Sequence, residues 1–301
     1  MKWLIYGAFS SVLFALWGLF AKLSSFQNPI ISNFILASGA FLTAVAVLLA
    51  TNRRLIFSKF AIIAGFFGGI QSIIILLLLL KNQLILVLPF TSIAGVIFFL
   101  IVYFTERPSY NIKQKILAGT GMFFSLVGLF LIATGSVGFV NFFMQISVDA
   151  TYIFFGILIG VTAAISTYFG YRSTKFEKID AATYVFWNLV ASLVPAIIAL
   201  LVFNPSAILQ LFSLSSAGYY YPTLGGICVS FGIFFMYKAF RKTTTKTKLQ
   251  EAIIGILSNG ELIALPFLSY FILGESVVQG YIGVAVVLIG LSLINYSEVM
   301  G

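Results

Sequence analysis

The chain has 301 residues, of which 61% are hydrophobic and 8% are charged, and its mean hydropathy is +1.11. A soluble domain of this length does not need so much apolar surface, so the composition is typical of a protein that crosses a membrane several times. The sequence has no His and one Cys, Cys228. These counts exclude an internal disulfide, thiolate metal clusters and His-based acid–base catalysis. We expect no metal site and no cofactor.

Ten apolar segments are each close to the roughly 20 residues that a helix needs to cross a bilayer. Lys2 begins an apolar run that is too long for the core of a signal peptide, so we expect the first span to be retained. The connections are short, and the fold class is therefore an all-α membrane protein with ten transmembrane helices. The expected spans are Trp3–Leu23, Ile30–Ala50, Phe60–Leu80, Leu84–Thr105, Ile116–Ala133, Tyr152–Tyr171, Ala181–Phe203, Tyr219–Phe240, Leu249–Leu273 and Val277–Tyr296.

Local patterns mark several helix starts. A polar residue followed three positions later by Gln resembles a capping box, and Asp before an apolar run is suited to an N-cap. We therefore predict helix starts at Asn111 with Gln114, at Ser276 with Gln279, at Asp149 and at Asp180.

The basic residues indicate how the chain is oriented. If the N-terminus is cytoplasmic, 15 of the 17 Lys and Arg residues lie inside and only Lys22 and Lys81 lie outside. This bias predicts a multi-pass protein of the plasma membrane with both termini in the cytoplasm. It also explains the net charge of +9 without a nucleic acid partner. We interpret the cluster Arg241–Lys248 as a topology determinant. The alternative is that it binds anionic lipid headgroups.

The chain is predicted to be a repeat of two five-helix halves, residues 1–140 and 141–301. In each half the fourth span ends in a glutamate turn, and the next helix carries two glycines seven positions apart. Because five is odd, the halves insert upside down relative to each other, and such inverted repeats are typical of alternating-access transporters. We expect the glycines to allow close helix packing and the turn glutamates to fix their turns. The repeated residues are Glu106 with Gly121 and Gly128, and Glu275 with Gly283 and Gly290.

These motifs resemble the drug/metabolite transporter superfamily, specifically its ten-span EamA-like branch. In two places the sequence departs from that pattern: Pro89 stands further from the glutamate turn than usual, and Asn33 is the nearest polar residue where an Arg is often found. The resemblance implies a basket of helices with a cavity lined by spans one, three, four, six, eight and nine. It also implies export or exchange of small organic solutes. The matching pieces are Trp17-Gly18 with Lys22, the turn at Glu106, and the run Leu273–Gly283 continuing to Gly290.

Glu261 is the carboxylate that lies far from both ends of its apolar segment. A charge at mid-bilayer costs on the order of a few kcal/mol unless it faces a partner or a wet cavity, and intramembrane acids commonly serve ion or proton pathways. Ser258 shares a helix face with Glu261, whereas Asn259 points elsewhere. Pro266 removes a backbone hydrogen bond beside Glu261. We interpret Glu261 as the proton-coupling residue; the alternative is a neutral, hydrogen-bonded structural acid.

The remaining candidates are polar or aromatic residues well inside the spans. For Gln71 and Asn188 the alternative is an interhelical hydrogen bond, worth roughly 1 kcal/mol. For Trp17 and Tyr168 it is ordinary packing. The predicted substrate-binding residues are Glu261, Asn259, Ser258, Trp17, Gln71, Ser72, Tyr168 and Asn188.

The favoured function is secondary active transport of small organic solutes, such as amino acids, related metabolites or drugs, with protons as the candidate coupling ion. The sequence has no P-loop of the G-x-x-x-x-G-K-[ST] type, so gradients must supply the driving force. An intramembrane protease would need His metal ligands or a pair of intramembrane aspartates, and the chain lacks both. The alternatives are a flippase or transporter of a lipid-linked or nucleotide-sugar-like substrate, and a non-transporting membrane scaffold.

The topology can be tested by cysteine labelling. With Ser58→Cys and Ser276→Cys, we expect a membrane-impermeant reagent to label the two positions from opposite sides, because one connection lies inside and the other outside. Labelling from the same side would contradict both the topology and the inverted repeat.

Overall fold

A computed structural model describes the chain except for residues 1, 25–27, 81, 83, 107–110, 135–145, 178, 204, 244–260, 276–277 and 300–301. The described residues form helices and short helical turns, with no strand among them. In chain order these are α1 (Lys2–Ser24), α2 (Pro29–Thr51), α3 (Lys59–Leu79), α4 (Leu84–Val87), η1 (Leu88–Ser92), α5 (Ile93–Glu106), α6 (Ile112–Thr134), α8 (Ile146–Arg172), η2 (Ser173–Glu177), α9 (Ala181–Phe203), α10 (Ala207–Leu211), α11 (Ser216–Thr243), α13 (Glu261–Phe271) and α14 (Val278–Val299).

Seven of these helices, within the described ranges, are long and apolar enough to cross a bilayer: α1, α2, α3, α6, α8, α9 and α11. The chain is thus an all-α, multi-pass membrane protein. The predicted fourth, ninth and tenth spans fall on shorter apolar helices or run into undescribed residues. The total of ten spans therefore stays a prediction.

The fourth predicted span is not one continuous helix. It is divided into α4, the 3₁₀ turn η1 and α5. Pro89 lies in η1, where it has no backbone N–H to donate and its ring hinders a regular α-helix. The prediction of an unbroken helix over Leu84–Thr105 was wrong at this point.

Two of the predicted helix starts are confirmed. At α6 the backbone N–H of Asn111 donates to Gln114 Oε1 at 2.8 Å, and the N–H of Gln114 donates to Asn111 Oδ1 at 2.9 Å. At α9 the Asp180 carboxylate accepts from the backbone N–H of Ala182 at 3.0 Å and of Thr183 at 3.1 Å. The predicted helix start at Asp149 was wrong, because α8 begins at Ile146 and Asp149 is its fourth residue. The side chains of Ser276 and Gln279 lie outside the described residues.

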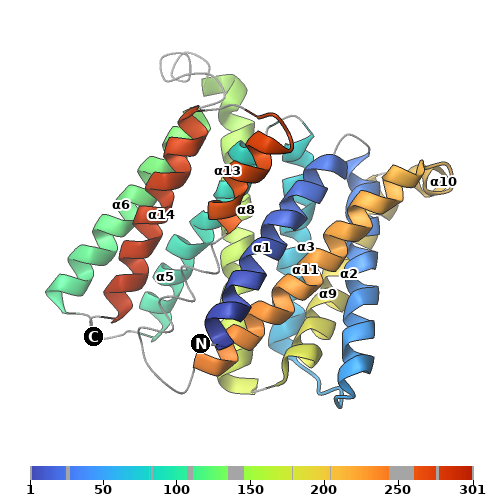
Figure 1. Cartoon of the computed structure of the whole chain (residues 1–301), viewed down its shortest axis with the longest axis horizontal. Helices are drawn as coiled ribbons and strands as arrows, with labels where there is room; N and C mark the ends of the chain where they lie inside the picture. The colour runs from blue at the N-terminus through green and yellow to red at the C-terminus, as the bar shows by residue number, and fades with distance from the viewer. Residues whose placement is uncertain are drawn as a thin grey trace.

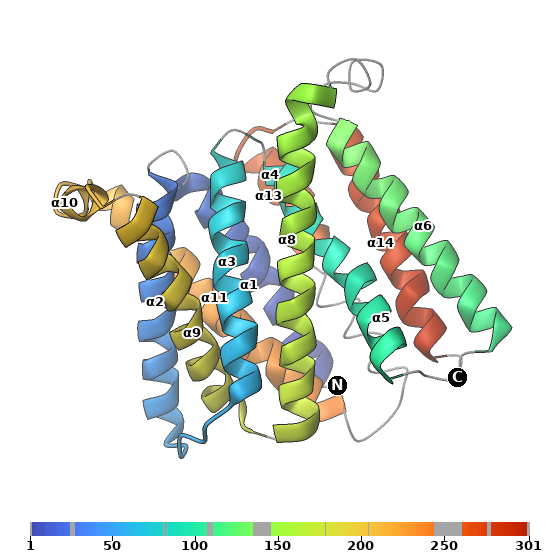
Figure 2. The same cartoon turned by 180° about the vertical axis from the view of Figure 1, so that it is seen from behind.

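The helices pack as a curved row with a separate pair at one edge (Figures 1 and 2). The row runs α13, α1, α11, α2, α9, α3, α8, α5, each helix packing against the next, and α13 also contacts α4. Helices α6 and α14 lie side by side at the edge, away from α2 and α9 (Figure 1).

The α6–α14 pair crosses at the four predicted glycines. A Cβ built on Gly121 would lie 2.6 Å from the carbonyl oxygen of Gly290, and one built on Gly128 would lie 2.6 Å from that of Gly283. Real side chains do not approach backbone so closely, so glycine is required for this contact. The packing role predicted for these glycines is confirmed.

Basic side chains gather at one end of the bundle. This end holds the start of α1 and the end of α14 (Figure 1). The loop between α2 and α3, the start of α6 and the ends of α8 and α11 also lie there (Figures 1 and 2). Ser58 lies at the same end, but it is fully buried as the N-cap of α3. The exposed neighbour Asn52 is the better cysteine position for the labelling test. The described basic side chains at this end are Arg53, Arg54, Lys59, Lys113, Lys115, Arg172, Lys238 and Arg241.

The glycine crossing can be tested by thermal unfolding in detergent. Gly121→Ala should lower the melting temperature, because it overpacks the crossing at a cost of about 1–3 kcal/mol. Gly119→Ala on the same helix is the matched control, since a Cβ there meets nothing within 4 Å. The control should melt at or above the temperature of the unaltered chain. Equal melting temperatures for the two variants would contradict the close approach of α6 and α14.

Candidate functional site

The Glu261 side chain lies where α13 faces the broken part of the fourth span. It is the first residue of α13 and is 7% exposed. Its Oε1 atom lies 2.9 Å from Thr91 Oγ1 in η1, and this hydroxyl also lies 2.7 Å from the carbonyl oxygen of Leu88. The acid therefore has a hydrogen-bond partner 170 residues away along the chain.

The single proton of the Thr91 hydroxyl limits the hydrogen bonds that this contact can form. A threonine hydroxyl has one proton, yet Thr91 Oγ1 has two acceptors within reach. A charged Glu261 would share that single proton with the carbonyl of Leu88. A neutral Glu261 can instead donate to Thr91 while Thr91 donates to Leu88, so both hydrogen bonds are complete. The geometry is thus suited to a carboxyl group that takes up a proton.

Among the described residues, no Lys or Arg forms an ion pair with Glu261. Helix α13 packs against α1, α4 and α14, and the charged side chains described near it are Lys22 and Glu275. Lys22 Nζ donates to the carbonyl oxygens of Leu79 at 2.8 Å and Asn82 at 2.7 Å. It is thus directed to the end of α3 rather than to Glu261.

Glu275 fixes the start of α4. Its Oε1 atom accepts a hydrogen bond from the backbone N–H of Leu84 at 2.7 Å, and its backbone carbonyl accepts from the Tyr281 hydroxyl at 2.6 Å. Helix starts leave N–H groups without partners and favour negative charge. The Glu275 carboxylate thus fixes the start of α4 rather than its own turn, and the turn-fixing role expected for this side chain stays a prediction. The side chain of its counterpart, Glu106, lies outside the described residues.

Trp17 belongs to the same buried cluster as Leu262 and Leu265, which follow Glu261 in α13. The Trp17 side chain is buried, and its indole Nε1 has no hydrogen-bond partner among the described residues. A buried donor without an acceptor loses free energy. Trp17 therefore offers a buried donor that a bound solute would satisfy.

The other candidates are not joined to Glu261 by a described contact. The Asn188 amide donates to the Tyr184 hydroxyl at 3.5 Å, and its backbone carbonyl lies against Gly65 at the α3–α9 crossing. The Tyr168 hydroxyl accepts from Arg172 Nη1 at 3.0 Å. The Asn188–Tyr184 bond lies within α9 and the Tyr168–Arg172 bond within α8, so neither is the interhelical hydrogen bond given as the alternative for Asn188. Substrate binding by Asn188 and Tyr168 stays a prediction.

On α3, Gln71 is half-buried and Ser72 has a buried Oγ without a partner in the described part of the chain. Ser258 and Asn259 lie outside the described residues. The helix face that Ser258 is predicted to share with Glu261 therefore stays a prediction.

Sequence reasoning missed Thr91, although a signal was present. Glu261 stands 14 residues before the turn glutamate Glu275, since 275 minus 261 is 14. Counting back 14 residues from Glu106 reaches Ser92, the neighbour of Thr91, and Pro89 lies just before them. The repeat thus pointed to the segment that contacts Glu261.

Comparison with known proteins bears on the fold alone. No family model and no curated protein matches the sequence. One solved structure, described only as a crystal structure of a protein, has a TM-score of 0.57 with this chain at 12% sequence identity. The match covers 96% of this chain and 97% of the other, so the two share a fold over nearly their whole lengths.

The Thr91–Glu261 contact can be tested by thermal unfolding. Thr91→Val keeps the shape of the side chain but leaves Glu261 without its described partner, which should cost about 1–3 kcal/mol and lower the melting temperature. Thr91→Ser keeps the hydroxyl and should melt close to the unaltered chain. The effect of Thr91→Val should shrink in a Glu261→Leu background. An undiminished effect there would show that Thr91 stabilises the fold without Glu261.

Proposed function

We propose that the chain is a secondary active transporter of small organic solutes that works by alternating access, with Glu261 at its coupling site. One observation carries the proposal: a buried carboxyl group, bonded to a threonine in a broken apolar segment. Ionisable groups inside membrane proteins are costly and commonly belong to a transport pathway. The motif resemblance to drug/metabolite transporters favours the same function.

The order of helices in the row supports two inverted five-helix repeats. Under a shift of five spans, α1 corresponds to α8, α2 to α9, α3 to α11, and α5 to α13. The row is α13–α1–α11–α2–α9–α3–α8–α5. Replacing each helix by its counterpart gives the same row in reverse order. The fifth and tenth spans, α6 and α14, pack on each other. This is the pattern that a two-fold relationship between the halves would produce.

Individual contacts support the same relationship. The eighth residue of α2 is Leu36, and its carbonyl oxygen lies against Gly226 of α11. The eighth residue of α9 is Asn188, and its carbonyl oxygen lies against Gly65 of α3. Each contact joins a helix of one half to a glycine of the other half. Corresponding positions therefore make corresponding contacts.

The place of Glu261 within the repeat favours a binding site there. Inverted-repeat transporters bind substrate near the bilayer midplane, at interrupted helices in corresponding positions of the two halves. The equivalent of Glu261 in the first half is Ser92, next to the Thr91 that bonds to it. A contact between near-equivalent positions lies close to the symmetry axis, where the two halves meet.

The proposed coupling follows from the hydrogen bonds. A protonated Glu261 completes the bonds to Thr91 and Leu88 and suits a closed pathway. When the pathway opens to water, the carboxyl group can release its proton and accept a cationic or zwitterionic solute. We assign the buried indole N–H of Trp17, which has no acceptor among the described residues, as a donor for that solute. Alternation between these two occupants of one site gives proton–solute exchange.

Glu261→Gln tests the coupling. The amide is nearly isosteric and uncharged, so the protein should fold, but it cannot exchange a proton at this position. We expect flux into liposomes to lose its pH dependence, or cation binding to weaken. The solute is first found by thermal-shift screening of amino acids, nucleosides, sugars and amphipathic cations.

Glu177→Gln is the matched control, because the Glu177 carboxylate accepts hydrogen bonds from Ser58, Ser173 and the backbone N–H of Phe60 far from Glu261 in the sequence. It should lower the melting temperature but leave the pH profile unchanged. Glu261→Gln protein that moves solute with the profile of the unaltered chain would contradict the coupling role.

A further inference from the structure

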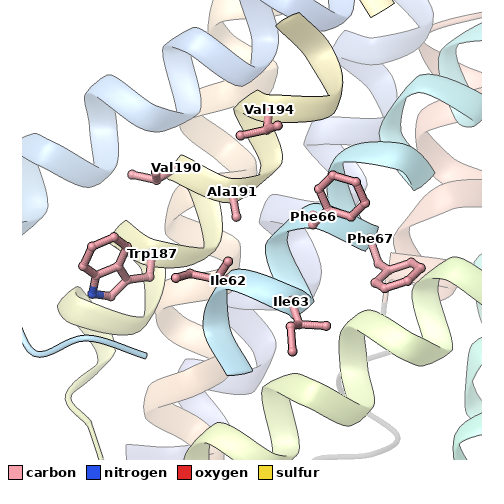
Figure 3. Close-up of a pocket in the computed structure, with 8 residues that line it drawn as sticks. All are labelled: Ile62, Ile63, Phe66, Phe67, Trp187, Val190, Ala191 and Val194. Carbon is pink, nitrogen blue, oxygen red and sulfur yellow. The ribbon is translucent and has the colours of Figure 1, made fainter. Parts of the chain in front are cut away.

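An apolar groove runs along the outer surface of the bundle between α3 and α9 (Figure 3). It encloses about 350 Å³. The groove is lined by Ile62, Ile63, Phe66, Phe67, Trp187, Val190, Ala191 and Val194. In a bilayer it faces the hydrocarbon region, since both helices are long and apolar enough to cross the membrane.

A basic and apolar loop, residues 52–58, lies at one end of this groove. The Trp187 indole N–H donates to the carbonyl oxygen of Ile56 at 2.8 Å, and the Trp187 ring lies 5.4 Å from the Phe57 ring, centroid to centroid. The Thr183 hydroxyl oxygen lies 3.3 Å from the carbonyl oxygen of Arg54 and 2.8 Å from Asp180 Oδ2. The loop is therefore held against the start of α9 rather than projecting freely.

The loop combines exposed positive charge with exposed apolar side chains. Arg53, Arg54 and the adjoining Lys59 are all exposed. Two carboxylates among the described residues lie near the loop, and each already accepts hydrogen bonds: Asp180 caps α9, and Glu177 accepts at the start of α3. The exposed apolar residues of the loop are Leu55, Ile56 and Phe57. Such a composition suits the boundary between lipid headgroups and acyl chains.

We propose that the groove and this loop together bind one phospholipid with an anionic headgroup. One acyl chain lies in the groove beside Trp187, and the phosphate lies against Arg53, Arg54 and Lys59. Other lipid tails are as apolar as the groove, so chain contact alone gives little preference. The preference comes from the basic residues, which attract anionic headgroups.

The charges argue against a second copy of the chain as the occupant. Two copies inserted the same way would meet through the same surface on each, as in most symmetric dimers. Arg53, Arg54 and Lys59 of both copies would then be brought together at one membrane face. An anionic lipid removes this repulsion, whereas a second protein copy creates it.

Fluorescence quenching by brominated lipids tests the site directly. The full-length Trp3→Phe/Trp17→Phe protein retains Trp187 as its single tryptophan, and it is titrated in detergent with phosphatidylglycerol or phosphatidylcholine brominated on the acyl chains. Phosphatidylglycerol should quench Trp187 at the lower mole fraction, with a preference on the order of five-fold for each basic residue involved.

Charge and shape variants separate the two parts of the site. Arg53→Gln/Arg54→Gln/Lys59→Gln should abolish the preference for phosphatidylglycerol. Lys113→Gln/Lys115→Gln, which removes exposed charges at the same end of the bundle on α6, should preserve it. Ala191→Phe fills the groove and should reduce quenching by both lipids. If Ala191→Phe is not monodisperse, Val190→Phe replaces it as the variant that fills the groove.

Several results would overturn the proposal. Equal quenching by both lipids in the protein with its loop intact would exclude a site for anionic lipid. A preference that survives the triple charge variant would exclude the loop. A protein that runs as a dimer and whose Trp187 is quenched by neither lipid would assign the groove to a second copy of the chain.

Discussion

In a bilayer the backbone cannot rely on water, so every interruption of a helix must be satisfied by other groups of the protein. In the described part of the stretch from Leu79 to Thr91, side chains supply several of these groups. Lys22 donates to the carbonyl oxygens at the end of α3, and Glu275 accepts from the first N–H of α4. Within η1, Thr91 donates to the carbonyl oxygen of Leu88. This interrupted segment then places the Thr91 hydroxyl beside Glu261.

Close backbone approach is the second constraint on the fold. Without a hydrophobic driving force between helices, packing in membranes depends on small residues that let backbones meet. Gly65 and Gly69 of α3 meet α9, Gly226 of α11 meets α2, and the α6–α14 pair meets through its glycines. Each of these contacts joins residues 1–140 to residues 141–301. The interface between the predicted halves is therefore built largely on glycine.

Local and compositional features of the fold were predictable from the sequence. Hydropathy identified the seven long apolar helices, because a span needs a minimum length of apolar residues whatever its neighbours are. The caps at Asn111 and Asp180 were predictable because they depend on residues two or three positions away. The break at Pro89 was not located, since prolines are tolerated within membrane helices when neighbouring groups satisfy the freed backbone.

The candidate site was predictable only in part, because its contacts are tertiary. A carboxylate in an apolar run can be recognised from the sequence as a candidate site residue. Thr91 cannot, because it resembles any threonine that bonds to its own helix. Asn188 shows the converse: a polar residue inside a span can face a cavity or a helix neighbour, and pattern alone does not distinguish the two. The predicted repeat offered the missing information. If a two-fold axis relates the halves, a residue near that axis lies close to its equivalent in the other half. The equivalent of Glu261 is Ser92, so the predicted repeat leads from Glu261 to the segment that bonds to it.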